Sequence, residues 1–74
     1  MPLTYLGVGE KARIAQITGD GDIRLFLIEL GFTLGRGIEI IQHTFGDNMI
    51  VKIGNSRLAL DRKMALHIQI DMLT

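Results

Sequence analysis

The chain is 74 residues long, 47% of them are hydrophobic, and eight basic and eight acidic residues leave no net charge. This length allows one domain, residues 1–74, and the hydrophobic content excludes an intrinsically disordered chain. The charge balance argues against a nucleic-acid binder, because such proteins usually carry a basic surplus. It also removes repulsion between copies, so a homo-oligomer remains an open alternative.

The chain contains no cysteine, which excludes disulfides, zinc ribbons and iron–sulfur sites. Its first residues, MPLTYLGVGEK, lack the basic and apolar regions of a secretory signal. No apolar run approaches the roughly 20 residues that span a bilayer. The short glycine pairs match no nucleotide-binding pattern. We therefore expect a cytoplasmic protein without a cofactor.

The first predicted element is a strand over Lys11–Ile17. Ile14 and Ile17 would fall on opposite faces of a regular strand, which indicates a bulge or bend nearby. A glycine-rich turn follows, in which Asp20 or Asp22 could cap a helix.

The second predicted element is a helix over Ile23–Leu30, which Gly31 ends by adopting a positive φ. Apolar residues at helical spacing give this helix a face toward the core, made of Ile23, Phe26, Leu27 and Leu30. Because the helix is short, packing on the sheet must hold it in place.

Four further strands are predicted, over Ile38–Thr44, Met49–Ile53, Arg57–Leu60 and His67–Met72. Gly54–Ser56 is typical of a tight hairpin, and Asp61–Ala65 predicts one helical turn capped by Asp61. Strands this short close best as a small barrel, which removes exposed edges. The expected fold is mainly β with a short helix, an SH3-like small β-barrel whose helix covers one open end.

No motif indicates catalysis, and we expect no enzyme activity. His43 and His67, with Glu39, Asp47 or Asp71, are an alternative set of ligands for a divalent metal. Their spacing matches no known metal site, so we favour the interpretation that both histidines are ordinary surface residues.

A partner surface is the better-supported hypothesis. The predicted helix carries a second apolar stripe, Leu25 and Ile28, flanked by Arg24 and Glu29. This stripe is either buried by the barrel or exposed as a patch for a protein partner. We name these four residues as the candidate partner-binding site.

The residues also resemble the FeoA family. The segment IELGFTLGRGIEII (Ile28–Ile41) is similar to that family's LxxLGFxxGxxIxV core. The segment GDNMIVKIGNSRLALDRKMALHIQI (Gly46–Ile70) is similar to GDPxxVxVxGxxIALRxxEAxxIxV, and KARIAQITGDG resembles the xAxIxxIxGxG start. The resemblance implies an SH3-like barrel without enzymatic activity. It also implies a role in bacterial ferrous iron uptake, with a FeoB-type transporter as the partner.

The same barrel resembles the C-terminal domain of DtxR-type repressors. That resemblance implies the alternative of a module that responds to divalent metal by binding it directly. Four positions depart from the FeoA pattern and weaken the transfer of partner contacts: Asn48 and Leu34, which replace prolines, and Asp61 and Met64, which replace Arg and Glu.

Overall fold

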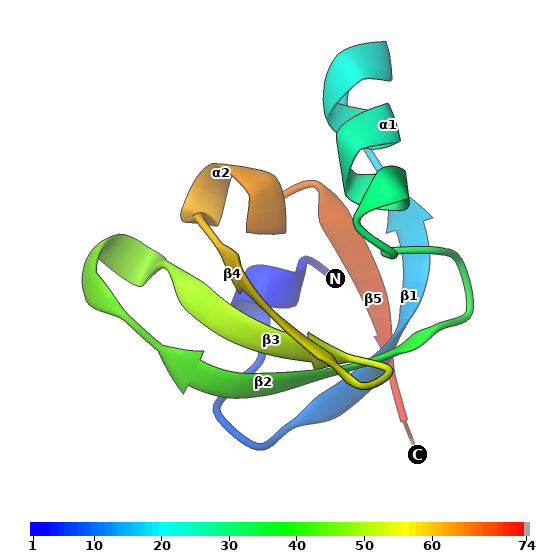
Figure 1. Cartoon of the computed structure of the whole chain (residues 1–74). Helices are drawn as coiled ribbons and strands as arrows, with labels where there is room; N and C mark the ends of the chain where they lie inside the picture. The colour runs from blue at the N-terminus through cyan, green and yellow to red at the C-terminus, as the bar shows by residue number, and fades with distance from the viewer. Residues whose placement is uncertain (74) are drawn as a thin grey trace.

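The computed structural model describes residues 1–73, in which five strands form one antiparallel sheet (Figure 1). The strands are β1 (Lys11–Ile17), β2 (Gly37–His43), β3 (Met49–Ile53), β4 (Ser56–Leu60) and β5 (Ile68–Met72). Their order across the sheet is β4-β3-β2-β1-β5. The five predicted strands are confirmed, with ends that differ by one residue at most.

Two irregularities bend this sheet. The pairing of β1 with β5 shifts register between Ile14 and Gln16, which confirms the bulge expected in the first strand. The pairing of β2 with β3 shifts between Ile40 and Gln42. Because a bulge bends its strand and increases the local twist, the sheet curls into the SH3-like shape that was predicted.

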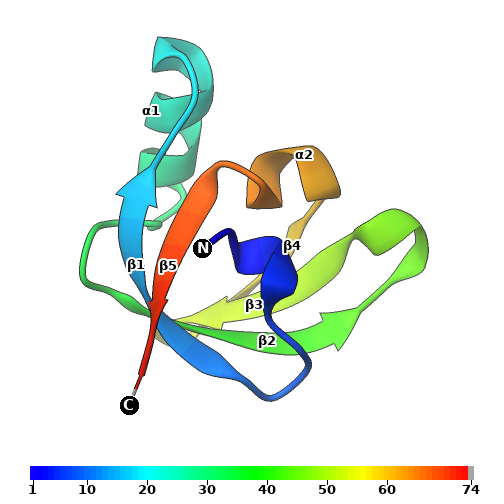
Figure 2. The same cartoon turned by 180° about the vertical axis from the view of Figure 1, so that it is seen from behind.

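The barrel stays open between its two edge strands, which corrects the expectation of closure. Within residues 1–73, β4 pairs only with β3 and β5 pairs only with β1 and the N-terminal residues. Two short helices, α2 (Arg62–Ala65) and the 3-10 helix η1 (Leu3–Tyr5), lie in this opening (Figures 1 and 2). Leu3 and Ala65 are fully buried there, so side chains fill the gap where strand pairing would otherwise have closed it.

The N-terminal segment was not predicted to have structure. Its first residue exchanges two hydrogen bonds with β5, from the Met1 ammonium to the Ile70 carbonyl (3.1 Å) and from the Ile70 amide to the Met1 carbonyl (2.7 Å). These bonds cover part of the outer edge of β5, which would otherwise be open to pairing with another chain. Among the described residues, the interior is wholly hydrophobic. The predicted helical turn capped by Asp61 is confirmed as α2, because the Met64 amide donates a hydrogen bond to the Asp61 carboxylate (2.8 Å).

The longer helix, α1 (Gly21–Glu29), projects from the sheet beside β1 rather than covering an end of the barrel (Figure 1). Asp20 caps it by accepting a hydrogen bond from the Ile23 amide (3.2 Å). The predicted core face was wrong in part: Leu27 is buried and Ile23 is half-buried, but Phe26 and Leu30 are 48% and 37% exposed. A helix that stands off the sheet can bury a narrow stripe only, so helical spacing overstated the buried face.

A Schellman motif ends α1 and places the next residue in the core. The Gly31 amide donates to the Ile28 carbonyl (3.0 Å), and the Phe32 amide donates to the Leu27 carbonyl (3.1 Å). Leu27 and Phe32, both fully buried, are the apolar pair that usually accompanies this motif. The motif depends on Gly31, whose φ is 108°.

Replacing Gly31 by alanine is therefore expected to lower the free energy of unfolding by about 1–2 kcal/mol, since an L side chain is strained at this φ. The new Cβ would also lie 3.2 Å from both Arg36 Nη1 and Ile53 Cδ1. Urea unfolding monitored by circular dichroism measures the change. Gly21→Ala is the matched control, because its Cβ would meet nothing within 4 Å and its φ is not positive. Equal stability of the two variants would contradict the prediction.

A candidate partner-binding groove between α1 and β1

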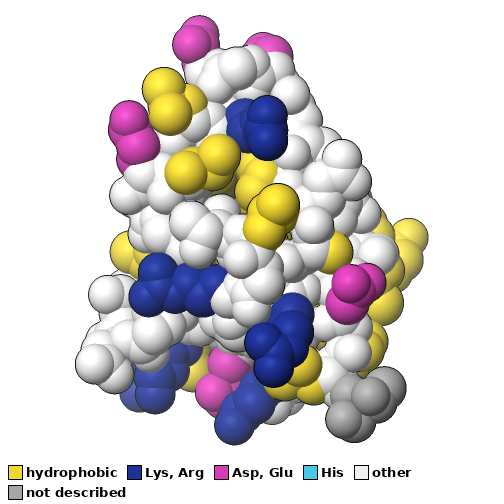
Figure 3. Space-filling model, turned by 90° about the vertical axis from the view of Figure 1, so that its right-hand side faces the viewer, with side chains coloured by type: hydrophobic (Ala, Val, Ile, Leu, Met, Phe, Trp, Pro, Cys, Tyr) yellow, Lys and Arg dark blue, Asp and Glu magenta, His cyan; other side chains and the backbone are white. Residues whose placement is uncertain are grey.

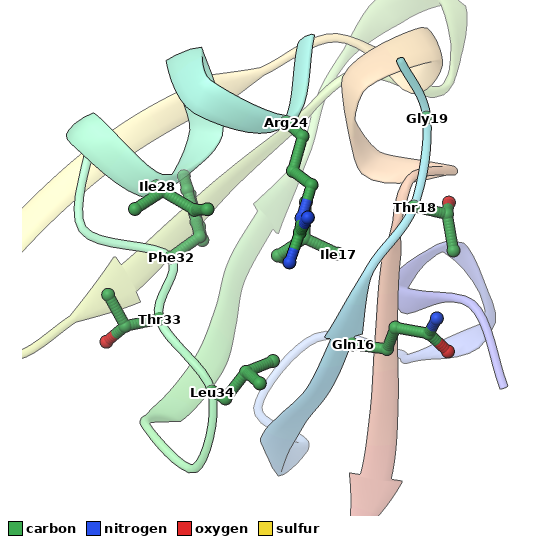
Figure 4. A pocket seen from close by; sticks show the side chains of 9 residues that line it. All are labelled: Gln16, Ile17, Thr18, Gly19, Arg24, Ile28, Phe32, Thr33 and Leu34. Carbon is green, nitrogen blue, oxygen red and sulfur yellow. The ribbon is translucent and has the colours of Figure 1, made fainter. Parts of the chain in front are cut away.

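A groove of about 640 Å³ opens between α1 and the end of β1 (Figure 4). One wall is the chain from Gln16 to Gly19, and the other is the segment 32–34 that follows α1. Arg24 and Ile28 reach the groove from the helix. We call this feature the α1–β1 groove. It exists because α1 stands away from the sheet and returns to it only through the Schellman motif.

The groove is mainly apolar and carries a cation. Ile17, Ile28 and Leu34 supply aliphatic surface, and the buried ring of Phe32 lies behind it. Figure 4 shows the Arg24 side chain extending from α1 into the space between the walls. Among residues 1–73, the only ion pair joins Arg62 and Asp47, which leaves Arg24 without a carboxylate within 4.0 Å. Such a groove suits an apolar group that also carries negative charge.

The structure separates the four predicted partner-binding residues into two pairs. Arg24 and Ile28 line the groove, whereas Leu25 and Glu29 lie on α1 outside it. Leu25 is 56% exposed and Ile28 is 38% exposed, so the alternative that the barrel buries this stripe is wrong. Figure 3 shows hydrophobic side chains gathered over α1 and the loop below it, with basic side chains among and beneath them.

Sequence reasoning missed the other half of the groove. Thr33 and Leu34 were assigned to a turn, yet Leu34 is 65% exposed and lines the groove. Leu34 stands where the family pattern has proline, so this chain carries an aliphatic side chain at the position. An exposed leucine inside a predicted turn was the available signal, because turns are usually polar.

The two histidines lie in different surroundings. The ring Nε2 of His43 lies 3.1 Å from the Leu6 carbonyl, and the ring Nδ1 of His67 lies 3.4 Å from Thr18 Oγ1. Within residues 1–73, no three His, Asp, Glu or Cys residues cluster closely enough to hold a metal ion. His43 does share a shallow depression with Asp47, but Arg62 lies there too. Metal binding through His43 and His67 stays the alternative that the sequence left open, and no contact in the described residues supports it.

Another exposed apolar residue lies outside the groove. Phe45 is 99% exposed in the η2 turn (Phe45–Asp47), where Gly46 and Asp47 adopt positive φ.

The described helices are all too short to cross a membrane.

The fold indicates the class of the protein, and the comparisons with known proteins show its family. Five antiparallel strands with a projecting helix and a groove beside it place the chain among small SH3-like domains. The model of the FeoA domain family matches residues 1–72. The chain therefore belongs to the FeoA domain family. The comparison with curated proteins gave no significant match.

Solved structures agree with this assignment. A crystal structure described as an iron uptake regulatory protein (FeoA) is 27% identical, with a TM-score of 0.89, and the match covers 99% of this chain and 96% of that one. The solution structure of iron(II) transport protein A from Clostridium thermocellum is 34% identical, with a TM-score of 0.91, over 99% of this chain and 46% of that one.

A third structure carries the same fold in another context. A manganese-dependent transcriptional repressor is 19% identical, with a TM-score of 0.90, over 99% of this chain and 41% of that chain. At this identity the likeness concerns the fold alone. It does not favour the alternative of a metal-responsive module.

Proposed function

We propose that this chain is a cytoplasmic accessory protein of bacterial ferrous iron uptake, which acts without catalysis by binding the cytoplasmic region of a FeoB-type transporter. Membership of the FeoA family and the printed descriptions of its relatives, an iron uptake regulatory protein and an iron(II) transport protein, support the process. The α1–β1 groove supports the mode of action. Its exposed aliphatic surface is the observation that carries the proposal.

The contact surface centres on Arg24, Leu25, Ile28 and Glu29. The two aliphatic residues give apolar area that water solvates poorly, Arg24 supplies a cation within the groove, and Glu29 lies on α1 at its polar margin. A helix that stands away from its own sheet has one side free for a partner. Ferrous iron is the cargo of the transporter in this proposal, and no site for it on this chain is required.

The test is co-purification of the tagged chain with a FeoB-type transporter in detergent or in nanodiscs. We expect a stable complex whose dissociation constant lies in the micromolar range or below, as for other specific regulatory contacts. The measurement is repeated with the isolated cytoplasmic region of the transporter, which should retain most of the affinity. Failure of the folded chain to associate with the intact transporter in a bilayer would overturn the proposal.

A further inference from the structure

The last part of β1 is hydrogen-bonded on one side only. Its first half pairs with β2 through Lys11–Arg13. Two more bonds follow, from the Ile14 amide to the Arg36 carbonyl (2.9 Å) and from the Gly35 amide to the Ile14 carbonyl (2.7 Å). Beyond this point the chain 32–34 diverges, while β5 continues to pair with β1 as far as Ile17 (Figure 4). The α1–β1 groove occupies the place where a strand would lie.

The bulge in β1 decides which backbone groups face this groove. In an antiparallel ladder, successive residues direct their N–H and C=O groups to opposite sides. The groups of Ile14 point away from β5, and without a bulge those of Gln16 would do the same. The register shift reverses this alternation. Gln16 pairs with Gln69, and the Thr18 amide donates to the His67 carbonyl (2.8 Å), so the backbone groups of Gln16 and Thr18 face β5.

The amide and carbonyl of Ile17 consequently point into the groove. Outside the strand ladders, no hydrogen bond within residues 1–73 involves either group. A free strand edge beside a helix is the arrangement used when an extended peptide adds a strand to a sheet. A helical partner could cover the apolar surface, but it would leave both Ile17 groups without partners, which is unfavourable once water is excluded.

The charges around the groove select the composition of that peptide. Arg24 extends into it, whereas Arg13 and Arg36 bind the loop that follows α1 and do not line the groove. Arg13 Nη1 donates to the Gly35 carbonyl (3.2 Å), and Arg36 Nη1 donates to the Gly31 carbonyl (3.2 Å). Within residues 1–73 none of the three arginines pairs with a carboxylate. The Arg24 guanidinium in the groove is therefore available to pair with an acidic side chain of a partner.

We infer that the α1–β1 groove binds an extended, acidic segment of a protein partner, which adds to the sheet as a strand along Ile17. One aliphatic side chain of the segment lies against Ile28 and Leu34, and an acidic side chain pairs with Arg24. The assignment of this segment to a FeoB-type transporter rests on the proposed function. The binding mode rests on the geometry of the β1 edge at Ile17 and of the groove.

Amide hydrogen exchange followed by NMR tests the edge directly, with all side chains intact. In the free chain, the Ile17 amide should exchange faster than those of Gln16 and Thr18, because the latter two bond to β5. The probe is a synthetic ten-residue peptide of alternating valine and glutamate. At saturation it should slow exchange at Ile17 by about tenfold or more and leave Gln16 and Thr18 unchanged. Absence of binding, or binding without protection of Ile17, would overturn the inference.

Two control peptides separate backbone from side-chain recognition. The first replaces every glutamate by lysine, and the second keeps all side chains but carries N-methyl groups on alternate amides. Both should bind at least about tenfold more weakly than the probe, since the first loses charge complementarity and the second cannot complete the ladder. Equal affinity of the N-methylated peptide would show that no strand is added.

Variants of the chain complete the test. Arg24→Glu should weaken binding of the valine–glutamate peptide by about tenfold, whereas Lys63→Glu, on α2, should leave it unchanged. The transporter experiment is independent of this series. If the peptide binds as described and the transporter does not, the proposed function fails and the binding mode stands. If the transporter binds without protecting Ile17, the binding mode fails and the function stands.

Discussion

Replacing Phe32 by alanine is expected to lower the free energy of unfolding by about 3–5 kcal/mol, the usual cost of removing a buried phenylalanine ring. Phe32 is fully buried and belongs to the hydrophobic core, and its amide completes the Schellman motif at the end of α1. A domain of this size is stabilised by about 4–11 kcal/mol in total. The variant should therefore unfold at a much lower urea concentration, measured by circular dichroism.

Phe26→Ala is the matched control for this prediction. The same side chain is removed, but Phe26 is 48% exposed on α1, so we expect a loss of about 1 kcal/mol or less. Comparable destabilisation by the two substitutions would show that α1 packs its Phe26 face on the sheet after all. The comparison therefore tests the placement of the helix, on which the groove depends.

The strands were predictable because their signals are local. Alternating apolar residues, as in Met49–Ile53, and turn residues such as Gly54 mark a strand wherever it lies in the fold. The bulge in β1 was predictable for the same reason, since Ile14 and Ile17 cannot both face the core of a regular strand. The caps Asp20 and Asp61 and the terminator Gly31 were likewise readable from the residue types.

The position of α1 was not predictable from its own residues. Helical spacing identified an apolar face with Phe26 and Leu30, but spacing does not say how closely the helix approaches the sheet. That distance depends on the Schellman motif at Gly31 and on the path of the chain after Phe32, which are tertiary features. The direction of the Ile17 amide and carbonyl was not predicted either, because it depends on the register in which β1 pairs with β5.

The double substitution Leu25→Asp, Ile28→Asp is expected to weaken binding to the FeoB-type transporter by about 100-fold or more, while the chain stays folded. Burying two unpaired carboxylates in an apolar contact is strongly unfavourable, and central aliphatic anchors carry much of the energy of an interface. Both residues are partly exposed in the free chain, so the free energy of unfolding should fall by no more than about 2 kcal/mol. Titration into nanodisc-embedded transporter measures the affinity, and circular dichroism checks the fold.

The control Val8→Asp, Phe45→Asp introduces the same two charges at exposed apolar positions outside the groove. It should bind the transporter as the unmodified chain does, because any general effect of added negative charge is common to both variants. Loss of binding in the control alone would move the contact surface to the Phe45 turn. Loss in both would indicate long-range repulsion, and raising the salt concentration would then restore both, whereas a direct contact at Leu25 and Ile28 stays weak in high salt.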